Sequence, residues 1–185
     1  MRKASLFLAG LVALAAAPLA ASASDLSYRY AEGGYQQVDS SVDSRGVYVR
    51  GAYEFGQTGV YALGSYADLS NDGFDVNPRP AELGAGYHYN FSPRLHGIGE
   101  VAYQRTHTRY GNVEGWRGSV GVRGQFSDTW EGLAKVNYYD RADYRGDTTG
   151  TVGVQYRITP VWGLAGEVEF DNRDQSYQVG VRASF

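Results

Sequence analysis

Residues 47–55 read VYVRGAYEF, and the side chains alternate in character along the whole segment. The odd positions carry Val, Val, Gly, Tyr and Phe, whereas both charged residues, Arg50 and Glu54, fall at even positions. An α-helix would spread these charges around its circumference, but a β-strand places alternate residues on opposite faces. The segment therefore predicts a strand with one uncharged face and one face that carries charges.

The same alternation recurs along the chain. Residues 116–126 read WRGSVGVRGQF and residues 177–185 read YQVGVRASF, each with its arginines on one face. Marking every such run predicts ten strands, each near the roughly 9–11 residues with which a tilted strand crosses a bilayer. The predicted strands are residues 26–38, 45–56, 59–70, 80–91, 94–106, 114–126, 129–141, 147–158, 161–172 and 175–185.

The connections between these strands alternate between two kinds. Tight turns rich in Gly, Pro, Ser and Asp are expected at residues 56–59, 90–93, 127–129 and 158–160. Longer polar loops are expected around residues 39–44, 70–80, 107–113, 142–146 and 171–176. Short turns at one end and longer loops at the other are typical of bacterial outer-membrane barrels.

Three hairpins also repeat one another, at residues 86–103, 121–138 and 153–170. Each has Ser or Thr in its turn and places Glu100, Lys135 or Glu167 at the equivalent position of the second strand. Propeller blades have four strands in about 40–45 residues, so a two-stranded unit favours an up-and-down barrel instead. The predicted fold is all-β: an antiparallel, up-and-down transmembrane β-barrel with ten strands, or eight as the alternative.

The composition narrows the function classes. The chain has 25 Gly, 16 Tyr, 7 Phe and 3 Trp, and it has no Cys, which excludes a disulfide framework and a cysteine-ligated metal. A net charge of −3 argues against nucleic acid as a partner. Aromatic residues near strand ends, mostly beside the tight turns, predict an interfacial girdle on an apolar outer surface. They are Phe55, Tyr61, Tyr89, Phe126, Trp130, Tyr156, Trp162 and Phe185.

The first residues resemble a secretory signal peptide. Arg2 and Lys3 precede an uncharged, mostly apolar stretch over residues 6–17, and residues 21–23 match the A-x-A cleavage pattern. The apolar stretch is shorter than the roughly 20 residues of a spanning helix, which disfavours the alternative of a retained anchor. The expectation is a signal peptide at residues 1–23, cleavage between Ala23 and Ser24, and an exported barrel domain at residues 24–185.

Charges in the middle of the strands predict a polar lumen. An Arg at the bilayer midplane costs about 2–4 kcal/mol on the lipid-facing side of a barrel, so these residues are expected to face inward and to pair. The predicted lumen charge network comprises Arg50, Glu54, Glu100, Arg123, Lys135, Glu167 and Arg182.

No catalytic, metal-binding or cofactor-binding residue is assigned. His88, His96 and His107 have no metal-ligand spacing, and no H-E-x-x-H motif or positioned catalytic partner accompanies them. The chain is therefore predicted not to be an enzyme and to need no cofactor. A lipid A-modifying enzyme is the less favoured alternative.

The C-terminus and the first strand carry a family resemblance. Phe185 at the end of the chain, with Tyr177, Val179 and Val181 at alternating positions, resembles the assembly signal that the outer-membrane insertion machinery reads. Residues 26–35, LSYRYAEGGY, and the repeated hairpins resemble small outer-membrane barrels of proteobacteria, and within them the Ax-type outer-membrane barrel family. This resemblance implies exposure at the cell surface and release in outer-membrane vesicles, with no defined chemistry.

Two functions remain open on this basis. The favoured one is a structural or surface-interaction barrel with a lumen packed with paired charges, and the alternative is a narrow porin-like channel through the lumen that ten strands enclose. The expected partners are the lipid bilayer, lipopolysaccharide and the barrel-assembly machinery, and the expected state is a monomer in the bacterial outer membrane. Lipid A phosphates would contact arginines expected near the loops: Arg45, Arg105, Arg109, Arg141 and Arg145.

Overall fold

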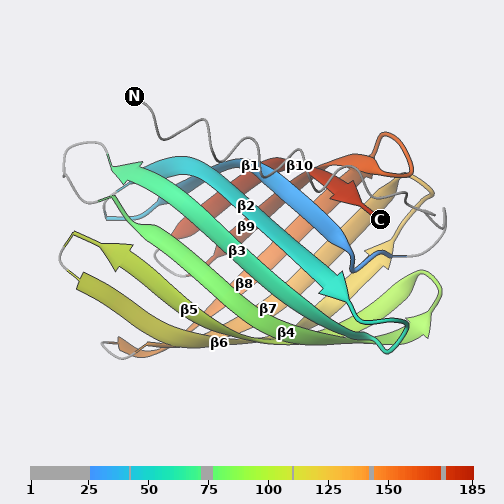
Figure 1. Ribbon diagram of the computed structural model, residues 1–185, viewed down its shortest axis with the longest axis horizontal. Coiled ribbons are helices and arrows are strands. Elements are labelled where there is room, and N and C mark those ends of the chain that lie inside the picture. Colours follow the sequence, from blue (N-terminus) through green and yellow to red (C-terminus); the bar gives the residue numbers. More distant parts are fainter. Residues whose placement is uncertain (1–25, 42, 72–76, 110, 142–143, 172–173) are drawn as a thin grey trace.

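The chain forms one closed barrel of ten antiparallel strands (Figure 1). The computed structural model describes residues 26–41, 43–71, 77–109, 111–141, 144–171 and 174–185. Each strand pairs with its neighbours in sequence, and β10 pairs with β1 to close the wall, which confirms the ten-strand, up-and-down prediction. The strands are β1 (Tyr30–Asp39), β2 (Ser44–Glu54), β3 (Val60–Asn71), β4 (Arg79–Ser92), β5 (Leu95–Thr108), β6 (Gly111–Gln125), β7 (Trp130–Arg141), β8 (Tyr144–Arg157), β9 (Trp162–Phe170) and β10 (Gln175–Ser184).

The two ends of the barrel differ. The tight connections β2–β3, β4–β5, β6–β7 and β8–β9 lie at one end, the turn end, on the right in Figure 1. Gly56 and Gly59 have positive φ angles of 67° and 77°, which explains the two glycines of the first tight turn. The C-terminus also lies at this end, where the Phe185 amide donates to the Arg29 carbonyl at 2.9 Å. The remaining connections form the opposite end, the loop end.

Two kinds of boundary differ from those predicted. β6 and β8 begin three residues earlier, because hairpin pairing continues to Thr108 opposite Gly111 and to Arg141 opposite Tyr144. β1 begins at Tyr30 and not at residue 26. Residues 26–29 alternate like a strand, but they leave the wall, and this part of the prediction is wrong for a reason that the lumen explains below.

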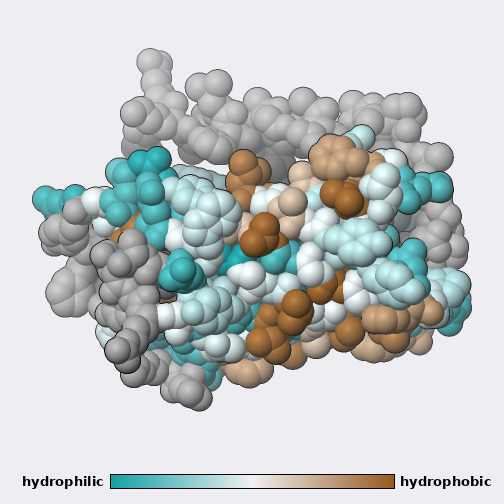
Figure 2. Space-filling view, turned by 90° about the horizontal axis from the view of Figure 1, so that it is seen from below, coloured by the Kyte–Doolittle hydropathy of each residue, from teal (hydrophilic) through white to brown (hydrophobic). Residues whose placement is uncertain are grey.

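Apolar side chains cover the outside of the barrel. Val47, Leu83, Val120 and Val179 point outward and are 64–71% exposed. Figure 2 shows hydrophobic residues over the middle of the wall and hydrophilic residues at the loop end, on the left. Exposure of a continuous apolar band is unfavourable in water and favourable in lipid. Within the described residues, no helix has the length and apolar character needed to cross a membrane.

Glycines on the inner face make room for large lumen side chains. A Cβ on Gly86 would meet the ring of Tyr61, and a Cβ on Gly180 would meet the hydroxyl of Tyr48. On the outer face, by contrast, Gly99 has open space around it. At Gly86 and Gly180, the packing of the lumen leaves no room for a side chain in place of glycine.

This difference predicts the effects of two matched substitutions. Gly86→Val is expected to lower the free energy of unfolding by about 1–3 kcal/mol, because the new side chain overlaps the Tyr61 ring and forces it to move. Gly99→Val, which adds the same atoms on the lipid-facing side, is expected not to destabilise the barrel. Urea unfolding from lipid vesicles measures both, and equal midpoints for the two variants would contradict the prediction.

Candidate functional site

The lumen is the candidate functional site, and two polar cavities lie along it. The larger cavity, of about 300 Å³, lies towards the loop end and is called the vestibule here. The smaller one, of about 70 Å³, lies towards the turn end. Five residues line both cavities: Tyr30, Arg50, Glu100, Lys135 and Glu167. The two cavities are therefore neighbours in series, separated by a layer of charged side chains.

One half of this layer is built around Glu32, whose side chain is fully buried. Arg50 contacts one carboxylate oxygen of Glu32 at 2.8 Å, and Arg182 contacts the other at 2.6 Å. The Tyr48 hydroxyl donates to Glu32 at 2.5 Å. Arg50 on β2 also contacts Glu167 on β9 at 2.9 Å. This second ion pair connects two strands that are not neighbours in the barrel. This arrangement satisfies the buried carboxylate with donors from three directions.

The other half is built around Arg117. Its guanidinium forms a two-point contact with Glu82, at 2.5 and 3.0 Å, and a further contact with Glu100 at 3.1 Å. Lys135 approaches the same oxygen of Glu100 at 3.4 Å, and the Tyr61 hydroxyl donates to Glu100 at 3.0 Å. Two-point arginine–carboxylate contacts are strong and directional. The charge belt is defined by both halves: Glu32, Arg50, Glu82, Glu100, Arg117, Lys135, Glu167 and Arg182.

All seven residues of the predicted network lie on the inner face of their strands. Five of them belong to the charge belt, as named above. Arg123 lies nearer the turn end and pairs with Glu131 at 2.6 Å, and Glu54 lies 3.2 Å from His88. The network therefore extends over more than one level of the lumen.

Sequence reasoning missed several charged members of the lumen: Glu32, Glu82, Arg117, Glu131 and Arg157. The alternation that identified Arg123 also placed Arg117 on the same face of the same strand, so the signal was present. Alternation does not indicate with which residue each charged side chain forms an ion pair. The pairing of Glu32 with Arg182 depends on the closure of β1 against β10, where the two residues lie opposite each other.

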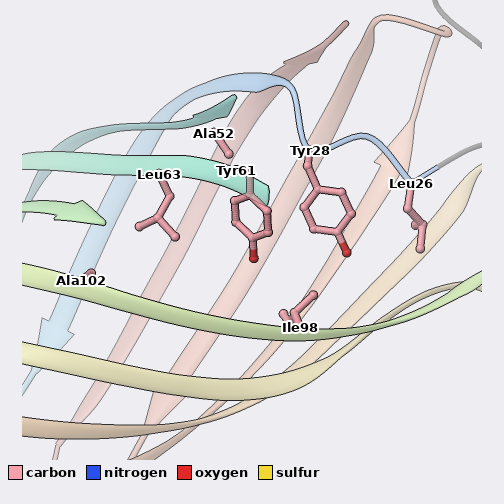
Figure 3. Packing of buried hydrophobic residues seen from close by; sticks show 7 residues of the cluster. All are labelled: Leu26, Tyr28, Ala52, Tyr61, Leu63, Ile98 and Ala102. Atoms are coloured by element: carbon pink, nitrogen blue, oxygen red, sulfur yellow. The ribbon is translucent and has the colours of Figure 1, made fainter. Parts of the chain in front are cut away.

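Residues 26–29 enter the lumen at the turn end, which corrects the predicted start of the first strand. Leu26 and Tyr28 are each only 4% exposed, and Figure 3 shows Tyr28 beside Tyr61 with Ile98 across from them. Arg29 holds the bend, because its guanidinium donates at 3.0 Å to the carbonyls of Glu54 and Gly56. Both apolar side chains alternate with polar ones, as in a strand, but they pack inside the barrel.

An aromatic stack surrounds Tyr28. Its ring lies parallel to that of His88 with a centroid separation of 4.1 Å, and His96 continues the stack, 5.0 Å from His88. Tyr61 also packs against Tyr28, with a centroid separation of 4.9 Å. Arg123 donates to the Ser27 carbonyl at 2.7 Å and lies over the Tyr28 ring. We call Tyr28, Tyr61, His88 and His96 the aromatic plug, since they fill the lumen at the turn end.

The lining of the vestibule is mixed. Its apolar residues include Val38, Leu63 and Ala67. Its polar residues include Gln36, Asn137, Tyr139, Glu169, Ser176 and Gln178. The third histidine, His107, lies outside the cavity lining, exposed at the loop end and in hydrogen-bond contact with Asn112 at 2.6 Å. No group of three or more His, Cys, Asp or Glu side chains in the described part of the chain could hold a metal ion.

The other predicted sites have the following positions. Tyr177, Val179 and Val181 point outward from β10, and Phe185 follows that strand. Arg45, Arg105 and Arg109 are exposed near the loop end, where Arg105 pairs with Glu114 at 3.5 Å. The side chains of Arg141 and Arg145 and the cleavage site at residues 23–24 lie outside the described part.

No family model and no curated protein matches the chain. Among solved structures, the NanC porin superimposes with a TM-score of 0.54 at 17% identity, covering 85% of this chain and 100% of that one. The KdgM porin in complex with disordered oligogalacturonate gives 0.48 at 17% identity, over 86% and 99% of the two chains. The outer membrane protein OprG from Pseudomonas aeruginosa gives 0.47 at 12%, over 88% and 98%. The chain has the fold of small outer-membrane porins, while the resemblance to the Ax-type barrels stays a prediction.

Proposed function

We propose that the protein is a narrow porin-like channel for small polar solutes in the bacterial outer membrane. The observation that carries this proposal is the pair of polar cavities in series, which share five lining residues. A barrel whose interior served only as a packed core would bring apolar side chains together along its axis. Here the space between the cavities is filled by paired charged side chains.

The membrane location rests on the outer surface. Val47, Leu83 and Val179 are exposed on the outside, while Arg50, Arg117 and Arg182 lie inside the barrel. This distribution suits a wall that contacts hydrocarbon. Export through the periplasm behind a cleaved signal peptide, residence as a monomer, and contact with lipopolysaccharide at the loop end are parts of the same proposal.

A structural or surface-interaction barrel is the second candidate, and the ion pairs favour it. Arg50 and Glu167 join β2 to β9, and Arg117 and Glu82 join β6 to β4, so each pair bridges non-neighbouring strands. Such contacts brace the lumen and oppose the passage of solutes. The two candidate functions therefore differ in whether ions pass through the charge belt.

Planar-bilayer recording distinguishes them. Purified protein, refolded and checked by its heat-modifiable migration on gels, is expected to insert as discrete conductance steps in potassium chloride. Heat-unfolded protein at the same concentration is the control and is expected to give none. Absence of steps from folded protein would reject the channel and favour the structural barrel.

The C-terminal residue gives a separate prediction about assembly. Phe185→Ala is expected to reduce the amount of folded barrel in the outer membrane, because the alternating apolar residues at the end of β10 form the signal proposed for the assembly machinery. Phe170→Ala, at the loop end of β9, removes an equally large outward ring and is the control. Heat-modifiable migration of membrane fractions measures the folded amount, and equal amounts for both variants would reject the role of Phe185.

A further inference from the structure

The charges around the vestibule do not balance. Its lining includes three cations, Arg50, Arg117 and Lys135, and four carboxylates, Glu82, Glu100, Glu167 and Glu169. Arg117 pairs with Glu82 and Glu100, Lys135 pairs with Glu100, and Arg50 pairs with Glu167. No ion pair within the described residues includes Glu169. The cavity therefore has one negative charge in excess, located at Glu169.

The carboxylate of Glu169 is held in one orientation. The Tyr139 hydroxyl donates to its Oε1 at 2.6 Å, and the Thr149 hydroxyl donates to the same atom at 2.7 Å. Both donors converge on one oxygen, and among the described residues none donates to Oε2. Hydrogen bonds to a carboxylate fix its direction without cancelling its charge. Glu169 is thus a positioned acceptor with one oxygen available.

A second acceptor without a donor lies on the adjacent strand. Within the described part of the chain, Oε1 of Gln178 is buried and has no hydrogen-bond partner. Gln178 on β10 is opposite Glu167, and Glu169 is opposite Ser176, so Gln178 and Glu169 are diagonal neighbours on the inner face. A buried acceptor without a donor is unfavourable. A ligand that donates N–H groups to Glu169 would therefore bind on the side of the lumen where a second acceptor also has no donor within the described residues.

We propose that the vestibule is a binding site for small organic ammonium compounds, with Glu169 as the residue that determines charge specificity. An ammonium group carries three N–H donors and no acceptor, which suits a carboxylate oxygen that receives no hydrogen bond from the described residues. Val38, Leu63 and Ala67 in the same lining suit a short apolar body on the same molecule. A volume of about 300 Å³ restricts the guest to a small molecule.

The ion pairs of the vestibule lining also exclude anions as the preferred ligands. Each cation that lines the vestibule already contacts a carboxylate, so a bound anion would have to break an existing ion pair. A bound cation would instead contact the Glu169 carboxylate, which forms no ion pair within the described part of the chain. This inference rests on the proposed channel and specifies it: solutes that enter from the loop end are selected for positive charge.

Direct binding tests the site without any current. Isothermal titration of folded protein in detergent with phenethylammonium chloride is expected to show saturable binding. Glu169→Gln, which keeps the size and an acceptor but loses the charge, is expected to weaken binding at least tenfold. Glu114→Gln, which neutralises an exposed carboxylate at the loop end, is the matched control and is expected to bind as the unchanged protein does.

The neutral and anionic analogues complete the test. 2-Phenylethanol is expected to bind much more weakly than the ammonium compound, and phenylacetate is expected not to bind. Equal affinity of the unchanged protein and Glu169→Gln for phenethylammonium, or equal binding of phenylacetate, overturns the proposal. If Glu169→Gln does not fold, Ser176→Lys replaces it, because an amine opposite Glu169 would occupy the site while the carboxylate stays in place.

Reversal potentials separate this proposal from the channel itself. In a potassium chloride gradient, the unchanged protein is expected to favour K⁺, and Glu169→Gln is expected to move the reversal potential towards zero. Binding that depends on Glu169, in a protein that passes no current, would reject the channel and keep the site. Current without binding of phenethylammonium would reject the site and keep the channel.

Discussion

Replacing Tyr28 with Ala and Leu26 with Ser is expected to raise the single-channel conductance several-fold. The two side chains fill the lumen at the turn end, where Tyr28 stacks on His88 and packs against Tyr61. Their removal would open the smaller cavity to solvent at the turn end and leave the charge belt as the narrowest level. Recording in planar bilayers under identical salt measures the change.

The control for this variant is Tyr35→Ala. Tyr35 lies on β1 and points outward, 48% exposed, so its loss changes the lipid-facing surface and leaves the lumen intact. Its conductance is expected to equal that of the unchanged protein. If the variant with both substitutions, at Leu26 and Tyr28, has the conductance of the unchanged protein, the aromatic plug is not the barrier. The charge belt alone then limits the current.

The strands were predictable because one physical rule governs the entire wall. A barrel in lipid needs an apolar outer face on every strand, so the period of two appears in each of the ten runs. Val47, Val49 and Tyr53 show it in β2, as do Tyr177, Val179 and Val181 in β10. Tight turns then fixed the order of neighbours, and the pairing of β10 with β1 closed the wall.

The first residues could not be predicted by this rule. Leu26 and Tyr28 alternate with Ser27 and Arg29 as residues of a strand do, and alternation does not tell whether a side chain faces lipid or fills the lumen. Their position depends on contacts distant in sequence, such as the hydrogen bond from Arg123 to the Ser27 carbonyl. The same limit applies to Glu169, because its lack of an ion pair within the described residues becomes visible only when the strands are in register.

The ion pairs in the lumen show a similar limit. Alternation predicts which face of a strand carries a charged residue, but it does not predict the partner of that residue. The equivalent positions of Glu100, Lys135 and Glu167 in the three hairpins predicted a shared level, and in the structure all three line both cavities. Their repeat does not indicate which residue has the most contacts. Among the described residues, Lys135 forms an ion pair with Glu100, which Arg117 also contacts, whereas Glu32 contacts two arginines and a tyrosine.

Glu32→Gln is therefore expected to be the most destabilising single change in the charge belt. The substitution keeps the volume but removes the negative charge between Arg50 and Arg182, which leaves two buried guanidinium groups facing each other with reduced compensation. Breaking a buried pair by removing one partner costs about 3–5 kcal/mol, and a loss of that size in the free energy of unfolding is expected here. Urea unfolding from lipid vesicles, followed by tryptophan fluorescence, measures the loss.

Glu114→Gln serves as the control for Glu32→Gln. Its carboxylate pairs with Arg105 at 3.5 Å, and both side chains are about half exposed, so water solvates what the substitution leaves behind. Its effect is expected to stay within about 0.5 kcal/mol. Equal midpoints for the two variants would mean that water screens Arg50 and Arg182 as fully as it does a surface pair. A lumen hydrated to that degree would no longer be braced by its ion pairs, and the structural candidate would lose the observation that favours it.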